Sequence, residues 1–160
     1  MAQVIFQVNE RLDDHKDVLI TKLVSGKVTF VHRKLWPEIL AIGVGREAWQ
    51  LKNLSNRALW LLQTIDERGS VTTDELPPPP SGKAKVGDAT RELEKRLLIN
   101  GAQIHTVSGA HAKILETWPH WASRVGLTST ISAPKAKKRL EERMLKLNQE
   151  FAADAKLPWQ

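Results

Sequence analysis

The chain has no cysteine among its 160 residues, and it has no long apolar run. The missing cysteines exclude disulfides and thiolate metal sites, which suits a reducing compartment. Residues 1–20 contain no uninterrupted apolar stretch of signal-peptide length, and no segment approaches the roughly 18 apolar residues of a membrane-spanning helix. These absences together predict a cytoplasmic protein.

What the chain does contain is typical of a soluble globular protein. Hydrophobic residues make up 41% and charged residues 26% of the sequence, which are ordinary proportions. The length predicts one domain, or one domain with appended helices, and is sufficient to bury a sizeable core.

Positive charge is distributed unevenly along the chain, whose net charge is +6. Residues 1–81 hold ten basic and ten acidic side chains, whereas residues 82–126 and 127–160 each hold seven basic and four acidic ones. A basic, asymmetric charge distribution is a feature of proteins that bind polyanions. A charge of this size also serves solubility, so composition leaves both interpretations open.

The N-terminal third predicts a helix, a strand and a second helix. Charged and aliphatic residues alternate from Val8 to Val24, where Leu12, Leu19 and Leu23 fall near one stripe, with His15 or Lys16 beside them. This spacing predicts a helix ending at Ser25-Gly26. The β-branched and aromatic run of residues 28–31 predicts a short strand.

Trp36-Pro37 suits the start of the next helix, since proline is tolerated at the first helical position. That helix is expected to stop at Gly43-Val44-Gly45. This Gly-x-Gly lacks a third spaced glycine and a Gly-Lys-Ser sequence, so it is not interpreted as a phosphate-binding loop.

Helix signals are clearer from Leu54 onward. Ser55 is a plausible N-cap for a helix that stops at Gly69, with Leu59, Leu62 and Ile65 directed inward. Thr72-x-x-Glu75 has capping-box spacing and predicts a very short helix over residues 73–76. Four prolines, 77–80, then form a stiff extended connection, which we interpret as a spacer in preference to a ligand for a proline-binding module.

Another helix is expected over residues 85–99, followed by a β-hairpin. Val86, Ala89, Leu93 and Leu97 have the spacing of a buried face, and Asn100-Gly101 is expected to end the helix. Residues 103–107 and 113–116 then read as two strands joined around Ser108-Gly109. A further helical turn or two is expected over residues 120–125.

A long C-terminal helix is predicted from Ser132-Ala133-Pro134 to about residue 153. It carries a narrow apolar seam of Leu140, Met144, Leu147 and Phe151. Such a seam packs either on the chain's own N-terminal helix or on its twin in a homodimer, and one seam does not distinguish the two.

Residues 54–118 resemble a winged helix-turn-helix domain. In this comparison residues 55–68, 72–76 and 85–99 correspond to the three helices, and residues 103–116 correspond to the wing. The expected fold is therefore α+β and mainly helical. Its divisions are an N-terminal helical segment (residues 1–53), a winged-helix domain (54–126) with a small β-hairpin wing, and a C-terminal helix (127–160).

The runs VHRKLWPEIL, ELEKRLL and IHTVSGAHAKILETW resemble bacterial winged-helix proteins related to the crosslink-repair DNA glycosylases. That resemblance implies a DNA-associated role and, in catalytic members, base excision. The family's catalytic signature is a glutamine–aliphatic–glutamine motif, which this chain lacks; Gln3 and Gln7 form the nearest pair, at the wrong spacing. The activity is therefore not carried over. The proline tract also makes the turn before the third helix longer than is usual for standard groove docking.

Duplex DNA is the predicted partner, bound through the third helix and the wing, and no cofactor, metal or catalytic group is predicted. Side chains expected to contact bases or phosphates are Lys83, Lys85, Arg91, Lys95, Ser108, His111, Lys113, Lys137, Lys138 and Arg139. Asp88 and Glu92 lie on the same predicted helix face and would repel phosphate. A solvated charged face and a protein-interaction module remain the alternatives.

Three histidines are the only clustered candidates for metal or acid–base chemistry: His105, His111 and His120. No Glu, Asp or Cys accompanies them at a known ligand spacing, so polar wing residues are the preferred interpretation and no enzyme is predicted. Trp118 and Trp121, near the base of the wing, are candidates for stacking on bases, whereas the other tryptophans are expected in the core.

Overall fold

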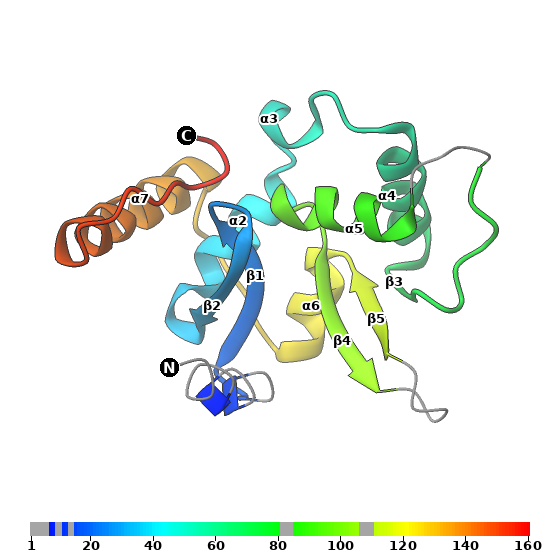
Figure 1. Cartoon of the computed structure of the whole chain (residues 1–160), viewed down its shortest axis with the longest axis horizontal. Coiled ribbons are helices and arrows are strands. Elements are labelled where there is room, and N and C mark those ends of the chain that lie inside the picture. Colours follow the sequence, from blue (N-terminus) through cyan, green and yellow to red (C-terminus); the bar gives the residue numbers. More distant parts are fainter. Residues whose placement is uncertain (1–6, 9–10, 13–14, 81–84, 106–110) are drawn as a thin grey trace.

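Helices and two small antiparallel sheets make up the described part of the chain, so the α+β class is confirmed. Figure 1 shows the computed structural model, which describes residues 7–8, 11–12, 15–80, 85–105 and 111–160. In chain order the elements are β1 (Val18–Val24), β2 (Lys27–His32), the 3-10 helix η1 (Arg33–Leu35), α2 (Trp36–Gly45), α3 (Ala48–Leu51), α4 (Asn56–Arg68), β3 (Ser70–Thr72), α5 (Val86–Lys95), β4 (Asn100–His105), β5 (His111–Glu116), α6 (Trp118–Val125) and α7 (Ala133–Glu150).

β1 and β2 form an antiparallel hairpin, which corrects the prediction of one helix from residue 8 to residue 24. Burial alternates along β1, with Leu19, Thr21 and Leu23 on the buried face. Two leucines four residues apart share a face in a strand as well as in a helix, so their spacing did not discriminate. Ser25 and Gly26 have φ of 51° and 66° and make the two-residue turn that such hairpins favour.

α2 is the most deeply buried helix, and it begins at Trp36-Pro37 as predicted. Ile39 and Ile42 are fully buried, and the helix continues through Gly43 to Gly45. Gly43 lies against the indole of Trp118, where no side chain would fit. Close packing on α6, not a helix stop, therefore accounts for this glycine.

α4 starts at the predicted cap, because the Ser55 hydroxyl accepts a hydrogen bond from the amide of Ala58 at 3.1 Å. It ends at Gly69, as predicted. Leu59, predicted to face inward, is 48% exposed, while Leu61 is fully buried. α5 and the second sheet cover the Leu61 side of α4, which the leucine-rich sequence did not reveal.

β3 and a turn replace the short helix predicted over residues 73–76. Thr72 pairs with Ile114 of β5, and the amide of Thr73 donates to the carbonyl of Lys113 at 2.9 Å. The backbone of Thr72 and Thr73 thus pairs with β5, while the Glu75 amide donates to the Thr72 carbonyl within the turn, at 3.0 Å. The resulting sheet has the order β3-β5-β4, with β5 in the centre.

α5 ends at Lys95, four residues before the predicted end. Leu97 adopts a left-handed conformation with φ of 51°, and Asn100-Gly101 belongs to β4 instead of ending the helix. Gln50 stabilises this chain reversal from α3, since its side-chain amide donates to the carbonyls of Arg96 and Leu97 at 3.0 and 3.4 Å.

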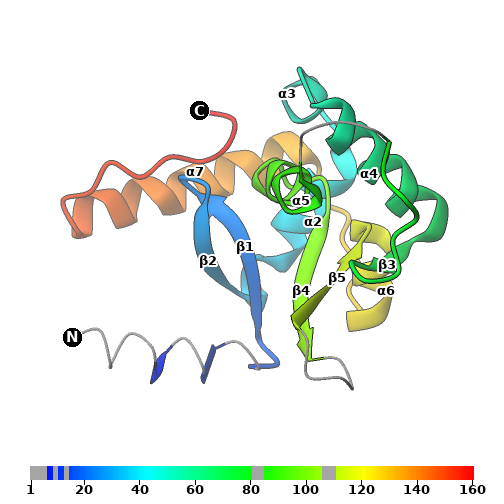
Figure 2. The ribbon, with the colours of Figure 1, turned by 45° about the vertical axis from the view of Figure 1, so that its right-hand side comes forward.

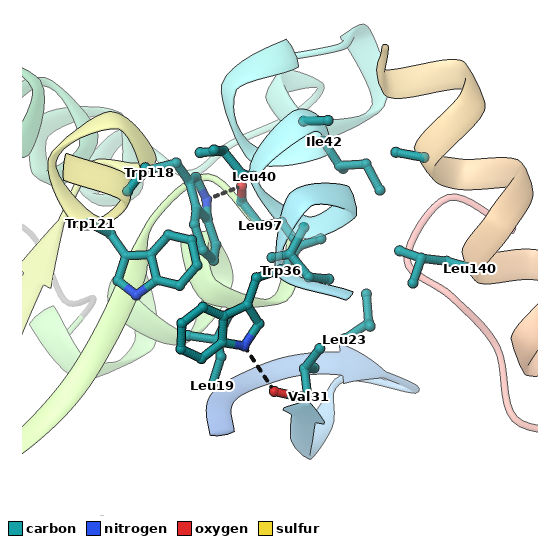
Figure 3. Packing of buried hydrophobic residues seen from close by; sticks show 14 of the residues in the cluster. Leu19, Leu23, Val31, Trp36, Leu40, Ile42, Leu97, Trp118, Trp121 and Leu140 are labelled. Atoms are coloured by element: carbon teal, nitrogen blue, oxygen red, sulfur yellow. Dashed lines mark hydrogen bonds between the residues drawn. The ribbon is translucent and has the colours of Figure 1, made fainter. Parts of the chain in front are cut away.

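Two hydrophobic clusters stabilise the described chain. The first includes residues from β1, β2, α2, α6 and α7, and contains Trp36, Trp118 and Trp121 (Figure 3). Trp121 makes edge contacts with both other rings, at centroid distances of 5.3 and 5.4 Å. The second lies between α4, α5 and the β3-β5-β4 sheet. Leu97 belongs to the first cluster and Leu98 to the second, so the turn between α5 and β4 joins them.

α7 packs on α2 through the first half of its apolar seam. Leu140 and Met144 are buried within their own chain, whereas Leu147 and Phe151 are 39% and 69% exposed. The C-terminal segment returns along α7 (Figures 1 and 2), and buries Leu157 in the first cluster. The intramolecular alternative therefore applies to the first half of the seam, although the partner is α2 and not a helix over residues 8–24.

Within the described ranges, no helix is long and apolar enough to cross a membrane.

Candidate nucleic-acid interface

The exposed face of α5 carries three of the predicted cations. Lys85 is the exposed N-cap residue, and Lys95 is exposed at the last turn. The guanidinium of Arg91 lies 3.7 Å from the carboxylate of Asp88, and both side chains are more than half exposed. An exposed pair of this kind contributes little to stability, so Arg91 can exchange it for another anion.

Glu92 has a structural role that lowers its influence on this face. Its two carboxylate oxygens accept hydrogen bonds from the Ser55 amide at 3.1 Å and the Ser55 hydroxyl at 2.7 Å. The carboxylate therefore faces the start of α4, where a helix N-terminus favours negative charge. Of the two acidic residues predicted to repel phosphate, Asp88 alone is left on the open side of the helix.

The predicted wing, residues 103–116, is only partly described. Lys83 and Ser108 lie outside the described residues, and His111 begins β5 as the backbone partner of His105. Lys113 is described fully: its ammonium lies 2.7 Å from a carboxylate oxygen of Glu94, a buried residue. This contact ties β5 to α5.

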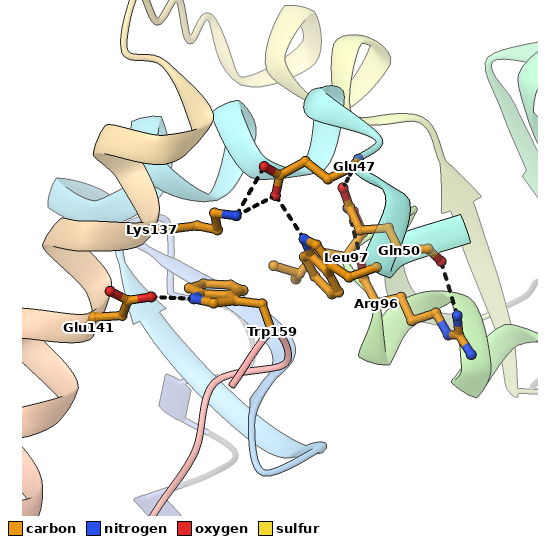
Figure 4. A network of polar contacts seen from close by, with 8 residues as sticks. Glu47, Gln50, Arg96, Leu97, Lys137, Glu141 and Trp159 are labelled. Carbon is orange, nitrogen blue, oxygen red and sulfur yellow. Dashed lines mark hydrogen bonds and ion pairs between the residues drawn. The ribbon is translucent and has the colours of Figure 1, made fainter. Parts of the chain in front are cut away.

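Two of the three cations predicted on α7 are also engaged within the chain. Lys137 binds both carboxylate oxygens of Glu47 at 3.0 and 2.8 Å (Figure 4), and Arg139 binds buried Glu38 at 2.9 Å. The hydrogen bond from Lys137, and then that from Trp49, lower the pKa of Glu47. Lys138, between them in sequence, is exposed.

A basic hollow of about 600 Å³ lies beside the C-terminal end of α5. Its side chains come from four parts of the chain, and the residues that matter here are Gly26, Trp49, Lys52, Lys95, Arg96 and Lys156. Arg96 donates to the carbonyl oxygen of Gln50 (Figure 4) and to that of Lys52, and so fixes the segment after α3. Sequence reasoning identified only Lys95, because no local pattern connects Lys52 and Lys156 to it.

Glu116 forms the most buried polar cluster of the second sheet. Its oxygens lie 2.5 Å from Arg124, 2.8 Å from Nδ1 of His120 and 3.0 Å from the Asn100 amide nitrogen. Burial by itself would raise the pKa of Glu116, but the hydrogen bonds from Arg124, His120 and Asn100 together lower it. The same pairing raises the pKa of Arg124. The cluster therefore holds a charged Glu116 and ties α6 to β4 and β5.

Trp118 and Trp121, predicted as candidates for stacking, are almost completely buried. The indole nitrogen of Trp118 donates to the carbonyl of Leu97 at 2.7 Å (Figure 3). Both indole rings lie in the hydrophobic core, so neither has an accessible face on which a base could stack.

A family profile described as AlkZ related matches residues 4–157. The chain belongs to the AlkZ-related family. AlkZ is a family of DNA crosslink-repair glycosylases, so this membership supports the DNA-repair relationship that the sequence runs implied. No curated protein and no solved structure matches the chain.

Membership of the AlkZ-related family covers nearly the whole chain, including both hydrophobic clusters and α7. The family match therefore includes nearly all of the described elements and is not limited to the β4–β5 hairpin. The glutamine–aliphatic–glutamine signature is still missing from the matched residues.

Proposed function

We propose that this AlkZ-related protein is a non-enzymatic, winged-helix DNA-binding protein that contacts duplex DNA through α5 and the wing. The observation that carries the proposal is the order α4-β3-α5-β4-β5 in a chain of this family, with β3 beside β5 in the sheet. A helix, an edge strand, a second helix and a hairpin in this order are the parts of a winged helix. The proline-containing segment takes the place of the middle helix.

The charges on α5 support this proposal. Lys85, Arg91 and Lys95 are exposed, and Glu92 is directed to the start of α4. An arginine on an exposed helix can pair with guanine in the major groove, and lysines contact phosphates. Lys138 on α7 is a further exposed cation for phosphate contact.

The ion pairs revise how the other predicted cations take part. Lys113, Lys137 and Arg139 each bind a carboxylate of the same chain, so a phosphate would have to displace Glu94, Glu47 or Glu38. Because these pairs connect separate elements, we assign them to stability in the proposal. Ser108, His111 and Lys83 retain their predicted role at the wing and its approach.

The non-enzymatic part of the proposal rests on the sequence. No glutamine–aliphatic–glutamine motif occurs, and excision without that signature is not expected in this family. An excision assay on alkylated duplex tests this part directly, since release of a free base would contradict it.

The second candidate function is a protein-interaction module without DNA binding. It is favoured by apolar side chains exposed on the C-terminal half of α7 and directly after it: Leu145, Leu147 and Phe151. Such residues form a possible contact surface for another protein, although a few scattered apolar side chains are normal on a surface.

A salt titration separates the two functions. Binding of a labelled random-sequence duplex, followed by fluorescence anisotropy, is expected at about 50 mM salt and should weaken steeply toward about 200 mM. Arg91→Ala should reduce preference among sequences, whereas Lys138→Ala should weaken all sequences alike. No binding at low salt, or an affinity indifferent to salt, would contradict the DNA-binding proposal and leave the interaction module.

A further inference from the structure

We infer that the basic hollow beside the C-terminal end of α5 binds the phosphate backbone of DNA, independently of sequence. This inference rests on the proposed DNA-binding function and adds to it a second contact surface, away from the wing. The ligand is a run of phosphate groups, and the residues that bind it are Lys52, Lys95 and Lys156.

The first support is that these three lysines are not neutralised. In the described part of the chain none of them forms an ion pair with a carboxylate, and no acidic residue lines the hollow. Lys113 and Lys137, by contrast, each bind a carboxylate within the chain. Ammonium groups gathered without a counter-charge repel one another and attract anions.

The second support is that tertiary contacts keep the lysines around one hollow. Ser25 holds the C-terminal segment, since its amide donates to the carbonyl of Lys156 at 2.8 Å and its hydroxyl accepts from the Lys156 amide at 3.2 Å. Arg96 holds the segment of Lys52 through that residue's carbonyl oxygen. The backbone segments that carry Lys52 and Lys156 are therefore held in place before any ligand arrives, which lowers the entropy cost of binding.

Gly26 contributes a close approach. A Cβ at this residue would lie 3.1 Å from Cε of Lys95, so the lysine stem lies directly over the β1–β2 turn. This contact directs Lys95 from α5 toward the hollow. Lys95 thus joins the exposed face of α5, which includes Arg91, to the hollow at the end of the helix.

The open form of the hollow favours a chain of phosphates over one small anion. Its lysines come from three separate segments, and all three are exposed. Among the described residues that line the hollow, none is a buried polar side chain that could enclose a single ion. Lysines make phosphate contacts that carry no sequence information, and each contact releases counterions from the nucleic acid.

The test compares two triple variants with equal charge loss. One is Lys52→Gln/Lys95→Gln/Lys156→Gln. The matched control is Lys16→Gln/Lys34→Gln/Lys146→Gln, which removes three exposed lysines elsewhere. Each changes the net charge from +6 by three units, and far-ultraviolet circular dichroism with thermal melting checks that both variants fold.

Affinity for a random-sequence duplex is measured across about 50 to 200 mM salt for the wild type and both variants. We expect the hollow variant to lower the slope of log affinity against log salt by about 2 to 3, because each lost phosphate contact removes about 0.9. The control variant should keep the wild-type slope within about 1.

The other possible results contradict either the inference about the hollow or the proposed function. If the hollow variant keeps the wild-type slope of log affinity against log salt, or if both variants lose slope equally, the inference that the hollow binds phosphates is overturned. The proposed DNA-binding function then still stands. No binding by the wild type overturns the proposed function and the hollow with it. If the lysines serve only to offset the dipole of α5, the hollow variant loses thermal stability but keeps the wild-type slope, which also overturns the inference.

Discussion

Trp118 of α6 lies directly on Gly43 of α2: a Cβ at Gly43 would be 2.3 Å from Cδ1 of the indole. The same indole donates to the carbonyl of Leu97, just beyond α5. One side chain therefore sets the distance between α2 and α6 and anchors the turn that leads from α5 to β4. The geometry depends on a glycine at residue 43.

We expect Gly43→Ala to lower the free energy of unfolding by about 1–3 kcal/mol, the usual cost of overpacking a core. The gain in helix propensity of about 1 kcal/mol offsets only part of the clash. Gly87→Ala is the matched control, because a Cβ there meets nothing within 4 Å. Urea denaturation should show Gly87→Ala equal to or more stable than the wild type; an equally tolerated Gly43→Ala would contradict the packing.

Replacement of Glu116 by Gln should destabilise the protein, because it removes the negative charge with which Arg124, His120 and Asn100 form hydrogen bonds. Hydrogen bonds to a charged group contribute about 1.5–3 kcal/mol, and partial exposure of Arg124 and His120 places the expected loss at about 1–2 kcal/mol. Denaturant unfolding at neutral pH measures the change. The exposed Glu150→Gln variant should remain within about 0.5 kcal/mol of the wild type.

The lowered pKa of Glu116 also predicts how stability depends on pH. Its ordinary value is 4.5 and its folded value is lower, so the unfolded chain takes up the proton first as pH falls. The stabilisation is complete above about pH 4.5 and is lost as pH falls through the folded pKa. Melting temperatures from pH 7 to pH 3 should therefore fall less steeply for Glu116→Gln than for the wild type. Parallel curves would show that Glu116 does not contribute; Glu47, whose pKa is also lowered, accounts for part of the remaining slope.

Ser55→Ala should cost about 1–2 kcal/mol, since it removes an N-cap hydrogen bond to Ala58 and a second one to Glu92. Ser132 provides the comparison: it is the N-cap residue of α7, but its side chain makes no capping hydrogen bond. Ser132→Ala should therefore have a much smaller effect in thermal unfolding. Equal losses would show that neither hydrogen bond of the Ser55 hydroxyl contributes to stability.

Leu140→Ala should destabilise the chain by about 2–5 kcal/mol through loss of core packing, whereas exposed Leu145→Ala should change stability by less than about 0.5 kcal/mol.

Analytical ultracentrifugation of the wild type is expected to show a monomer at micromolar concentration. A concentration-dependent dimer that Phe151→Ala abolishes would contradict this, and would assign the exposed half of the α7 seam to self-association.

Local signals in the sequence were sufficient for several elements. Ser55 and Gly69 bracket α4, Trp36-Pro37 opens α2, and the apolar periodicity of Val86, Ala89 and Leu93 marks α5. In each case a capping group, a proline or a helical period acts within a few residues, so the neighbouring sequence contains the cause. The same holds for the hairpin strands β4 and β5, and the runs that resemble glycosylase relatives pointed to the family.

Tertiary contacts decided the rest. Leu19 and Leu23 suit a helix or a strand, and pairing with β2 selects the strand. Thr72 and Glu75 suit a helix cap, but β5 offers the backbone partners that β3 uses. Pairing also determines which charges are available: distant carboxylates neutralise Lys113, Lys137 and Arg139, whereas Lys52, Lys95 and Lys156 gather around one hollow. Sequence alone determined which helices could form and that positive charge exceeds negative charge; only the folded chain decided where that charge is exposed, because ion pairing depends on residues distant in sequence.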